Sequence, residues 1–209
     1  MNKREFLITS TAFFTLLPMA GIQAQENPLI GRLNAYLTSL TTAQARFRQE
    51  NADGTIIGGS FYLKKPGQMR FEYDAPSDSL VVASGRTIAI FDAKSNVSPQ
   101  RYPQNRTPLS LLSRTNIDVT SSVFVRRIEE RGGRSYITLF DPEKPQNGTM
   151  IMIFENDPMA LVEWTVTDRA GLETHVYLEN LQTGMELQNR LFNIGYNVLQ
   201  FKRLHGDDN

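Results

Sequence analysis

The sequence predicts a mainly β fold, in which about ten or eleven short antiparallel strands form one sheet. Short segments that alternate apolar and polar residues recur along the chain, separated by Gly, Pro, Asn and Asp. No predicted strand leads into a long crossover helix, which argues against a doubly wound parallel sheet. Because a sheet of this size curls, we expect a half-closed, incomplete barrel with helices covering its mouth.

The composition narrows the possible functions. The chain has 209 residues, which suits one domain, and its 22 Lys and Arg balance its 22 Asp and Glu, so no strong field favours nucleic acid. It has no cysteine, which excludes disulfides, thiolate metal sites and a cysteine nucleophile. Two histidines, His175 and His205, are too few for a histidine-rich metal site. We expect no metal, no other cofactor and no nucleic-acid partner.

The first 24 residues have the pattern of a cleaved secretory signal. A basic start precedes an apolar run over residues 6–17, and Ala24 ends a plausible cleavage site. A membrane anchor is the alternative, but the run is short for a bilayer-spanning helix. We therefore expect residues 25–209 to form a single domain that is exported to a bacterial periplasm.

An amphipathic helix is predicted over residues 28–40. Asn27 can cap it, and Pro28 suits its first position. Its apolar residues recur at helical spacing, and they are Leu29, Ile30, Leu33, Tyr36, Leu37 and Leu40. This apolar stripe needs a partner surface, and the strands that follow can supply one.

The first strands are predicted from period-two alternation and from turn residues between them. They cover residues 43–48, 56–63, 69–73, 80–83 and 87–91. In the third of these strands, Met69, Phe71 and Tyr73 share one face. Arg70 and Glu72 share the opposite face, which we expect to meet water.

A long polar surface loop is predicted over residues 92–106, followed by a short leucine helix over residues 109–112. A short apolar helix behind a long loop can act as a movable lid. An ordinary core helix would give the same pattern, so both interpretations stay open.

The second run of strands is predicted at residues 123–128, 136–140, 150–154, 162–166 and 174–181. Residues 150–154 are apolar at every position, which indicates cover on both faces. After a polar stretch, residues 191–194 form another apolar segment, and the tail over residues 197–203 can add an edge strand. The last residues, 206–209, should be loose.

Several of these segments together are similar to a known family. They are residues 59–66 (GSFYLKKP), residues 69–73 (MRFEY), Pro76 and residues 80–85 (LVVASG). In this order and spacing they resemble the LolA family, whose members are periplasmic carriers of outer-membrane lipoproteins. The resemblance implies the half-closed barrel expected above, with a cavity that receives the acyl chains of a lipoprotein.

Large apolar residues on the alternating positions are the candidates for an acyl-binding cavity. A plain sheet core explains their pattern about as well, although flexible methionines suit irregular apolar partners. The resemblance to the LolA family favours the cavity. The candidates are Phe47, Phe61, Leu63, Met69, Phe71, Tyr73, Met150, Met152, Phe154 and Trp164.

The candidate lid and its latch follow from the same resemblance. The lid residues are Leu109, Leu111 and Leu112. In the family, the residue before the proline of the first motif is commonly an arginine that hydrogen-bonds the lid. Here it is Lys65, which lacks the planar fork of arginine, so we expect a weaker latch.

The expected function is that of a non-enzymatic, monomeric periplasmic carrier. The resemblance implies transfer of lipoproteins from an inner-membrane ABC transporter to an outer-membrane receptor or to the outer membrane itself. The receptor of this pathway is itself a lipoprotein and needs a cysteine, which this chain lacks. A secreted β-barrel hydrolase and a lipid-sensing regulatory domain are the alternatives. His175 lies in a predicted strand and His205 in the polar tail, and the chain has no GxSxG, HExxH or P-loop motif.

Overall fold

The computed structural model describes residues 28–94, 98–115 and 117–205 of the chain. The predicted secretory signal over residues 1–24 and the expected loose end over residues 206–209 lie outside the described residues, as does the expected helix cap Asn27.

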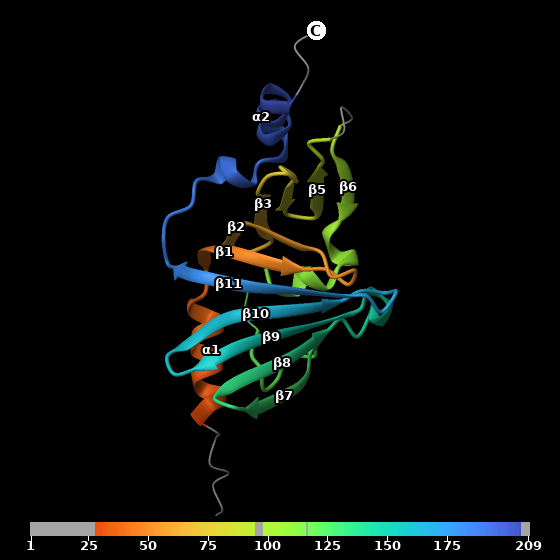
Figure 1. Ribbon diagram of the computed structural model, residues 1–209. Coiled ribbons are helices and arrows are strands. Elements are labelled where there is room, and N and C mark those ends of the chain that lie inside the picture. Colours follow the sequence, from red (N-terminus) through yellow and green to blue (C-terminus); the bar gives the residue numbers. More distant parts are fainter. Residues whose placement is uncertain (1–27, 95–97, 116, 206–209) are drawn as a thin grey trace, which may run out of the picture.

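The described residues contain one antiparallel sheet of 11 strands in the order β6-β5-β4-β3-β2-β1-β11-β10-β9-β8-β7. The strands are β1 Thr42–Glu50, β2 Ile56–Lys64, β3 Gln68–Tyr73, β4 Leu80–Ser84, β5 Thr87–Phe91, β6 Gln100–Pro103, β7 Val125–Arg131, β8 Arg134–Phe140, β9 Thr149–Asn156, β10 Met159–Thr167 and β11 Glu173–Thr183. Two meanders, β1–β6 and β7–β11, join where β1 pairs with β11. The sheet twists and curls but does not close, because β6 and β7 remain at opposite edges (Figure 1). This confirms the predicted mainly β, half-closed architecture.

The predicted first helix is present as α1, Pro28–Ser39, and it packs on β10 and against Phe154 of β9. Its leucine stripe, Leu29, Leu33 and Leu37, is buried as the helical spacing predicted. Tyr36 anchors it: the ring meets Phe154 edge to face at 5.7 Å, and the hydroxyl accepts a hydrogen bond from the Leu161 amide at 3.0 Å. Burial raises the pKa of Tyr36.

The predicted leucine helix is present as the 3-10 helix η2, Pro108–Leu111, directly after η1, Gln104–Arg106. Two further 3-10 helices are η3, Pro145–Asn147, and η4, Asn189–Phe192. The predicted long loop was wrong in part, since its residues Gln100–Pro103 form edge strand β6. All four residues of β6 are exposed, so no alternation marks them as a strand.

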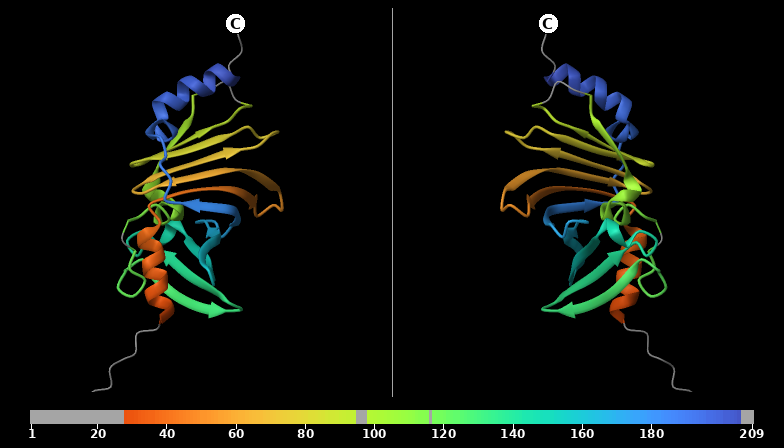
Figure 2. Two further views of the ribbon diagram at one scale, coloured as in Figure 1. Left: turned by 90° about the vertical axis from the view of Figure 1, so that its left-hand side faces the viewer. Right: turned by 90° about the vertical axis from the view of Figure 1, so that its right-hand side faces the viewer.

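The prediction for the C-terminal segment was wrong. Instead of extended segments at residues 191–194 and 197–203, the chain forms η4 and then a second α-helix, α2, Ile194–His205. Its residues Ile194, Val198 and Phe201 pack on the outer face of β4 and β5, where Phe201 lies 5.2 Å from Phe91 between ring centroids. Packing of its apolar face against the sheet therefore stabilises the helical conformation of this segment. Figure 2 shows α1 and α2 at opposite ends of the sheet.

The outer face of β3 is less exposed to solvent than the sequence suggested. The side chain of Arg70 is only 12% exposed, whereas that of Glu72 is 40% exposed. Arg70 donates hydrogen bonds to the carbonyl of Leu191 at 2.9 Å and to Asn197 Oδ1 at 2.7 Å. The expectation that Arg70 faces water was therefore wrong, because the C-terminal segment covers it.

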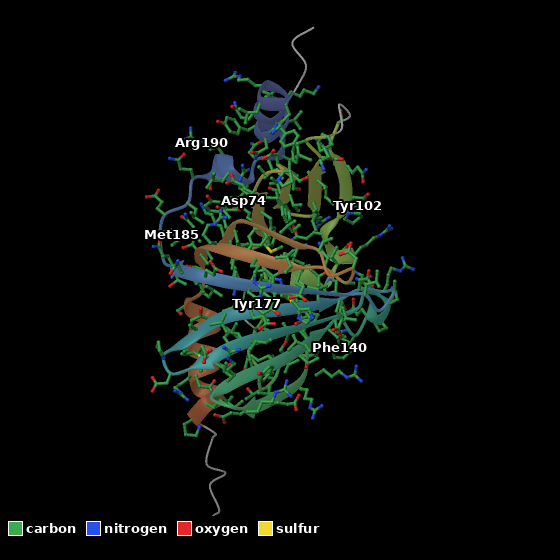
Figure 3. The ribbon with its side chains drawn as sticks, viewed as in Figure 1. Asp74, Tyr102, Phe140, Tyr177, Met185 and Arg190 are labelled. Atoms are coloured by element: carbon green, nitrogen blue, oxygen red, sulfur yellow. The ribbon has the colours of Figure 1, made fainter. Side chains whose placement is uncertain are left out.

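The connection from β11 to α2 is fastened to the outer face. Lys64 Nζ donates to the carbonyl of Leu187 at 2.9 Å and to Asn189 Oδ1 at 2.7 Å. Figure 3 labels Met185 and Arg190, which lie on this connection as it runs along the side of the sheet. The C-terminal segment is thus held by Lys64 and Arg70, two charged side chains that point away from the inner face.

Candidate functional site

An apolar cavity of about 460 Å³ lies on the inner face of the curled sheet. Strands from both meanders line it, together with the η1–η2 segment, residues 104–113. Its apolar walls include Phe71, Val81, Ile88, Trp164, Val166 and Val176. The size falls within the range of cavities that hold small organic ligands.

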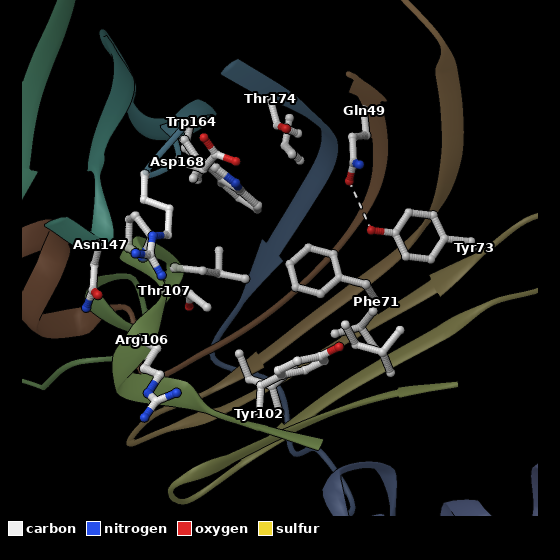
Figure 4. A pocket seen from close by; sticks show the side chains of 18 residues that line it. Gln49, Phe71, Tyr73, Tyr102, Arg106, Thr107, Asn147, Trp164, Asp168 and Thr174 are labelled. Carbon is white, nitrogen blue, oxygen red and sulfur yellow. Dashed lines mark hydrogen bonds between the residues drawn. The ribbon is translucent and has the colours of Figure 1, made fainter. Parts of the chain in front are cut away.

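The polar residues of the cavity are distributed unevenly. Arg106, Asn147 and Asp168 lie on one side, while Gln49 and Tyr73 lie on the other (Figure 4). Arg106 and Asp168 are solvent-exposed, so they form part of a hydrated rim. A ligand with a long apolar part and a polar end would match this arrangement, since the rim can solvate the end while the walls cover the rest.

One polar pair sits inside the cavity itself. The Tyr73 hydroxyl donates a hydrogen bond to Gln49 Oε1 at 3.0 Å. Burial raises the pKa of Tyr73 to about 12. The phenol therefore stays neutral at physiological pH, and its hydrogen bond leaves the ring as the main surface offered to a ligand.

The structure brings all the predicted cavity residues into one core, but only some of them line the cavity. Phe71, Tyr73 and Trp164 line it, and so does the predicted lid residue Leu109. The others are buried around it in the same cluster, and these are Phe47, Phe61, Leu63, Met69, Met150, Met152, Phe154, Leu111 and Leu112. The methionines therefore pack the core beneath the cavity, and the acyl-binding roles of all these residues stay predictions.

The sequence left open whether the leucine helix is a lid or an ordinary core helix, and the η1–η2 segment has features of both. Thr107, Pro108 and Leu109 form one wall of the cavity. The next leucines, Leu111 and Leu112, are each 1% exposed in the hydrophobic core. The segment thus forms a wall of the cavity with some residues and fills the hydrophobic core with others. If it moved outward, core surface would be exposed unless a ligand took its place.

Lys65 binds α1 in this structure. Its Nζ donates a hydrogen bond to the carbonyl of Leu37 at 3.2 Å, instead of the expected one to the leucine helix at 109–112. Leu37 lies in the last turn of α1, where carbonyls lack helical partners and attract cations. Burial lowers the pKa of Lys65 to about 8. The role of Lys65 as a latch stays a prediction.

Gln104 holds the η1–η2 segment, and the sequence carried no signal for it. Gln104 is 4% exposed and Ser113 is 3% exposed, although both are polar. With its amide nitrogen toward the sheet, Gln104 donates to the carbonyls of Gly85 at 2.6 Å and Gly67 at 3.2 Å, and its oxygen accepts from the Ser113 hydroxyl at 3.1 Å. The Gly67 amide also donates to the Ser113 carbonyl at 3.1 Å. One buried amide thus joins the segment to two hairpin turns.

His175, in strand β11, lies away from the cavity. His175 Nδ1 is 3.0 Å from Thr165 Oγ1 and 3.6 Å from Glu163, on the strand face opposite Trp164 and Val176. His175 is thus a strand residue, as predicted, and its ring nitrogen has a hydrogen-bonding partner. Among the described residues, no three acidic, histidine or cysteine side chains gather to hold a metal ion. None of the helices that the structure describes is long and apolar enough to span a bilayer.

Fold and cavity define a class of protein: a half-open antiparallel sheet that surrounds an apolar cavity, with a short helical segment as one wall. Residues 38–195 match the family described as "Outer membrane lipoprotein carrier protein LolA". The chain therefore belongs to the LolA family, as its motifs suggested.

The chain is also similar to individual proteins. An outer-membrane lipoprotein carrier protein of Methylococcus capsulatus is 32% identical over 181 residues, which cover 81% of this chain and 84% of that protein. One from Azotobacter vinelandii is 35% identical over 115 residues, covering 51% of this chain and 54% of that protein. Among solved structures, a LolA superfamily protein of Nitrosomonas europaea aligns with a TM-score of 0.43 and 10% identity, covering 81% of this chain and 97% of that one.

Proposed function

We propose that this protein is a periplasmic carrier that binds the acyl chains of lipoproteins and delivers them to the outer membrane. The apolar cavity beneath the η1–η2 segment is the observation that carries this proposal. Membership of the LolA family and the names of the relatives support the lipoprotein as cargo.

The energetics explain why a cavity is needed. Each methylene exposed to water is unfavourable by about 0.8 kcal/mol, so one long acyl chain amounts to on the order of 10 kcal/mol. A carrier must cover most of that surface, yet a cavity that fitted too well would not release its cargo. A cavity that is preformed in part, and that grows when one wall moves, meets both demands.

The partners follow from the direction of transport. The acyl chains would come from an inner-membrane ABC transporter that releases lipoproteins, and they would pass to an outer-membrane receptor or directly to the outer membrane. We propose that the carrier acts as a monomer without a cofactor. No observation on the described residues favours the hydrolase or the lipid sensor, and His175 lies on the face opposite the cavity.

A release assay tests the proposal. Spheroplasts that display an acylated reporter lipoprotein are incubated with the purified chain from residue 25 onward, and the soluble fraction is analysed for a complex. We expect reporter and carrier to elute together, with less reporter left in the membrane. If the reporter stays in the membrane while an established carrier releases it from the same spheroplasts, the proposed function is wrong.

A further inference from the structure

We propose that the outward face of α2 is a docking surface for an anionic phospholipid membrane. This surface consists of Tyr196, Leu199 and Arg203, which point away from the sheet, and of Lys202 and Leu204, which flank them on either side. Its apolar members are open to solvent: Leu199 is 67% exposed, Leu204 75% and Tyr196 38%. What sets these leucines apart from other exposed apolar residues is that they share one short helix with a tyrosine and basic residues, a grouping that is typical of a surface for an external partner.

The packing of α2 does not require these side chains. Ile194, Val198 and Phe201 already fill the inward face against β4 and β5. Asn197 closes the remaining gap, since its amide donates to the carbonyls of Leu191 and Asn193 and its oxygen accepts from Arg70. The helix therefore packs through its inner side and leaves Leu199 and Leu204 exposed, one on each side of its outward direction.

The charge of the helix favours an anionic surface. Lys202 and Arg203 are exposed in its last turn, and Ile194–His205 contains no acidic residue. Arg190, on η4, adds another exposed positive charge nearby. The two acidic residues that follow, Asp207 and Asp208, lie outside the described residues. A helix that exposes leucines, a tyrosine and basic residues has the composition of helices that lie in a membrane interface.

α2 and the cavity lie on opposite faces of the same strands. Adjacent residues of β5 face opposite sides: Phe91 contacts Phe201 of α2, whereas Ile90 lines the cavity and is 38% exposed. Tyr102, on the edge strand β6, also lines the cavity and is 46% exposed. A membrane that bound the outward face of α2 would therefore hold the protein by the side of these strands that is opposite the cavity.

Membrane docking does not depend on the proposed cargo, so it can be tested without lipoprotein. Flotation of the purified chain with phosphatidylglycerol–phosphatidylethanolamine vesicles measures binding, and phosphatidylcholine vesicles show how much depends on charge. We expect weak binding to the anionic vesicles. The binding should fall as salt is added, because salt screens exposed charges such as those of Lys202 and Arg203.

Two double variants make this test specific. Leu199→Ser with Leu204→Ser should lower the vesicle partition coefficient at least about tenfold, and Lys202→Gln with Arg203→Gln should remove the preference for anionic lipid. The matched control is Val123→Ser with Leu172→Ser, which removes apolar residues that are 67% and 57% exposed elsewhere, and it should bind like the unmodified chain.

The inference would be overturned in three ways: the unmodified chain floats with neither vesicle, the leucine variant binds as well as the control, or sedimentation shows a dimer that the leucine variant abolishes. The last result would assign the surface to a second copy of the chain. A failure in the spheroplast assay with intact vesicle binding would count against the proposed cargo alone.

Discussion

The rings of Phe47 and Tyr73 meet edge to face with centroids 5.3 Å apart, although strand β2 lies between the strands that carry them. Gly59 makes this possible, because it pairs with Phe47 on one side and with Tyr73 on the other and has no side chain between them. The two rings therefore contact each other across Gly59, and this contact holds Tyr73 where it borders the cavity.

Gly59→Ala should destabilise the protein. A Cβ at this position would lie 2.7 Å from Phe47 Cε1 and closer still to the backbone carbonyl of Glu72, so the strand would have to shift. We expect the free energy of unfolding to fall by about 1–3 kcal/mol, as for other overpacked cores. Urea denaturation measures this change.

Gly58→Ala is the matched control. Its Cβ would approach the carboxylate of Asp74 at 3.2 Å, which is the flexible end of a side chain. We expect its unfolding free energy to stay within about 1 kcal/mol of the unmodified protein. Equal losses at the two positions would contradict the pairing of Phe47 and Tyr73 across Gly59.

Gln104→Met should loosen the η1–η2 segment. Methionine has a similar shape but offers no donor to the carbonyls of Gly67 and Gly85. Since a buried group left without its partner is unfavourable by about 1–3 kcal/mol, we expect faster amide hydrogen exchange over residues 107–113. Asn105→Ala, at an exposed neighbour, should leave the exchange unchanged. If both variants exchange alike, Gln104 does not hold the segment.

Lys65 should make stability depend on pH above neutrality. Burial lowers the pKa of Lys65 from 10.5 to about 8, so between these values the unfolded chain binds more protons than the folded protein. The contribution of Lys65 to the unfolding free energy therefore rises with pH through this window. Tyr73, whose pKa burial raises to about 12, acts in the opposite direction above about pH 10.

Comparison with Lys65→Met isolates the lysine. Urea denaturation at about pH 8 and about pH 10 should show a rise for the unmodified protein that the variant lacks. Lys94→Met, at an exposed lysine, should keep the rise. An identical pH dependence in all three proteins would mean that Lys65 is not buried against α1 in solution.

Much of the sheet could be predicted because alternation is a local signal. In 69–73, the alternating Met69, Phe71 and Tyr73 are on the face that the sequence assigned to the core. Edge strand β6 could not be predicted, because all its residues are exposed and one edge of it has no partner strand. Alternation also could not tell that Arg70 is covered, because the cover comes from Leu191 and Asn197, more than a hundred residues later.

The candidate site was predicted only in outline, for a related reason. Large apolar residues marked the inner face, but burial in the core and exposure to a cavity look the same in a sequence. Trp164 lines the cavity while Met152, directly opposite it on β9, does not. Gln104 was missed because a glutamine in a polar loop predicts solvent exposure, and only the packing of two hairpin turns around it makes it buried.

The central claim is that the inner-face cavity holds the acyl chains, and β10 offers a direct test. Val166 lines the cavity, whereas its neighbour Thr167 points to the opposite face by alternation. Val166→Glu places a charge where hydrocarbon must lie, and Thr167→Glu places the same charge one residue further along. Both variants must first show cooperative unfolding near that of the unmodified protein.

The measurement is the amount of acylated lipoprotein recovered in complex with each variant from spheroplasts. Because about 1.4 kcal/mol corresponds to tenfold in affinity, a charge beside the acyl chain should lower loading by Val166→Glu at least about tenfold. Thr167→Glu should load like the unmodified protein. A folded Val166→Glu protein that loads normally, or an equal loss in both variants, would contradict acyl binding in this cavity.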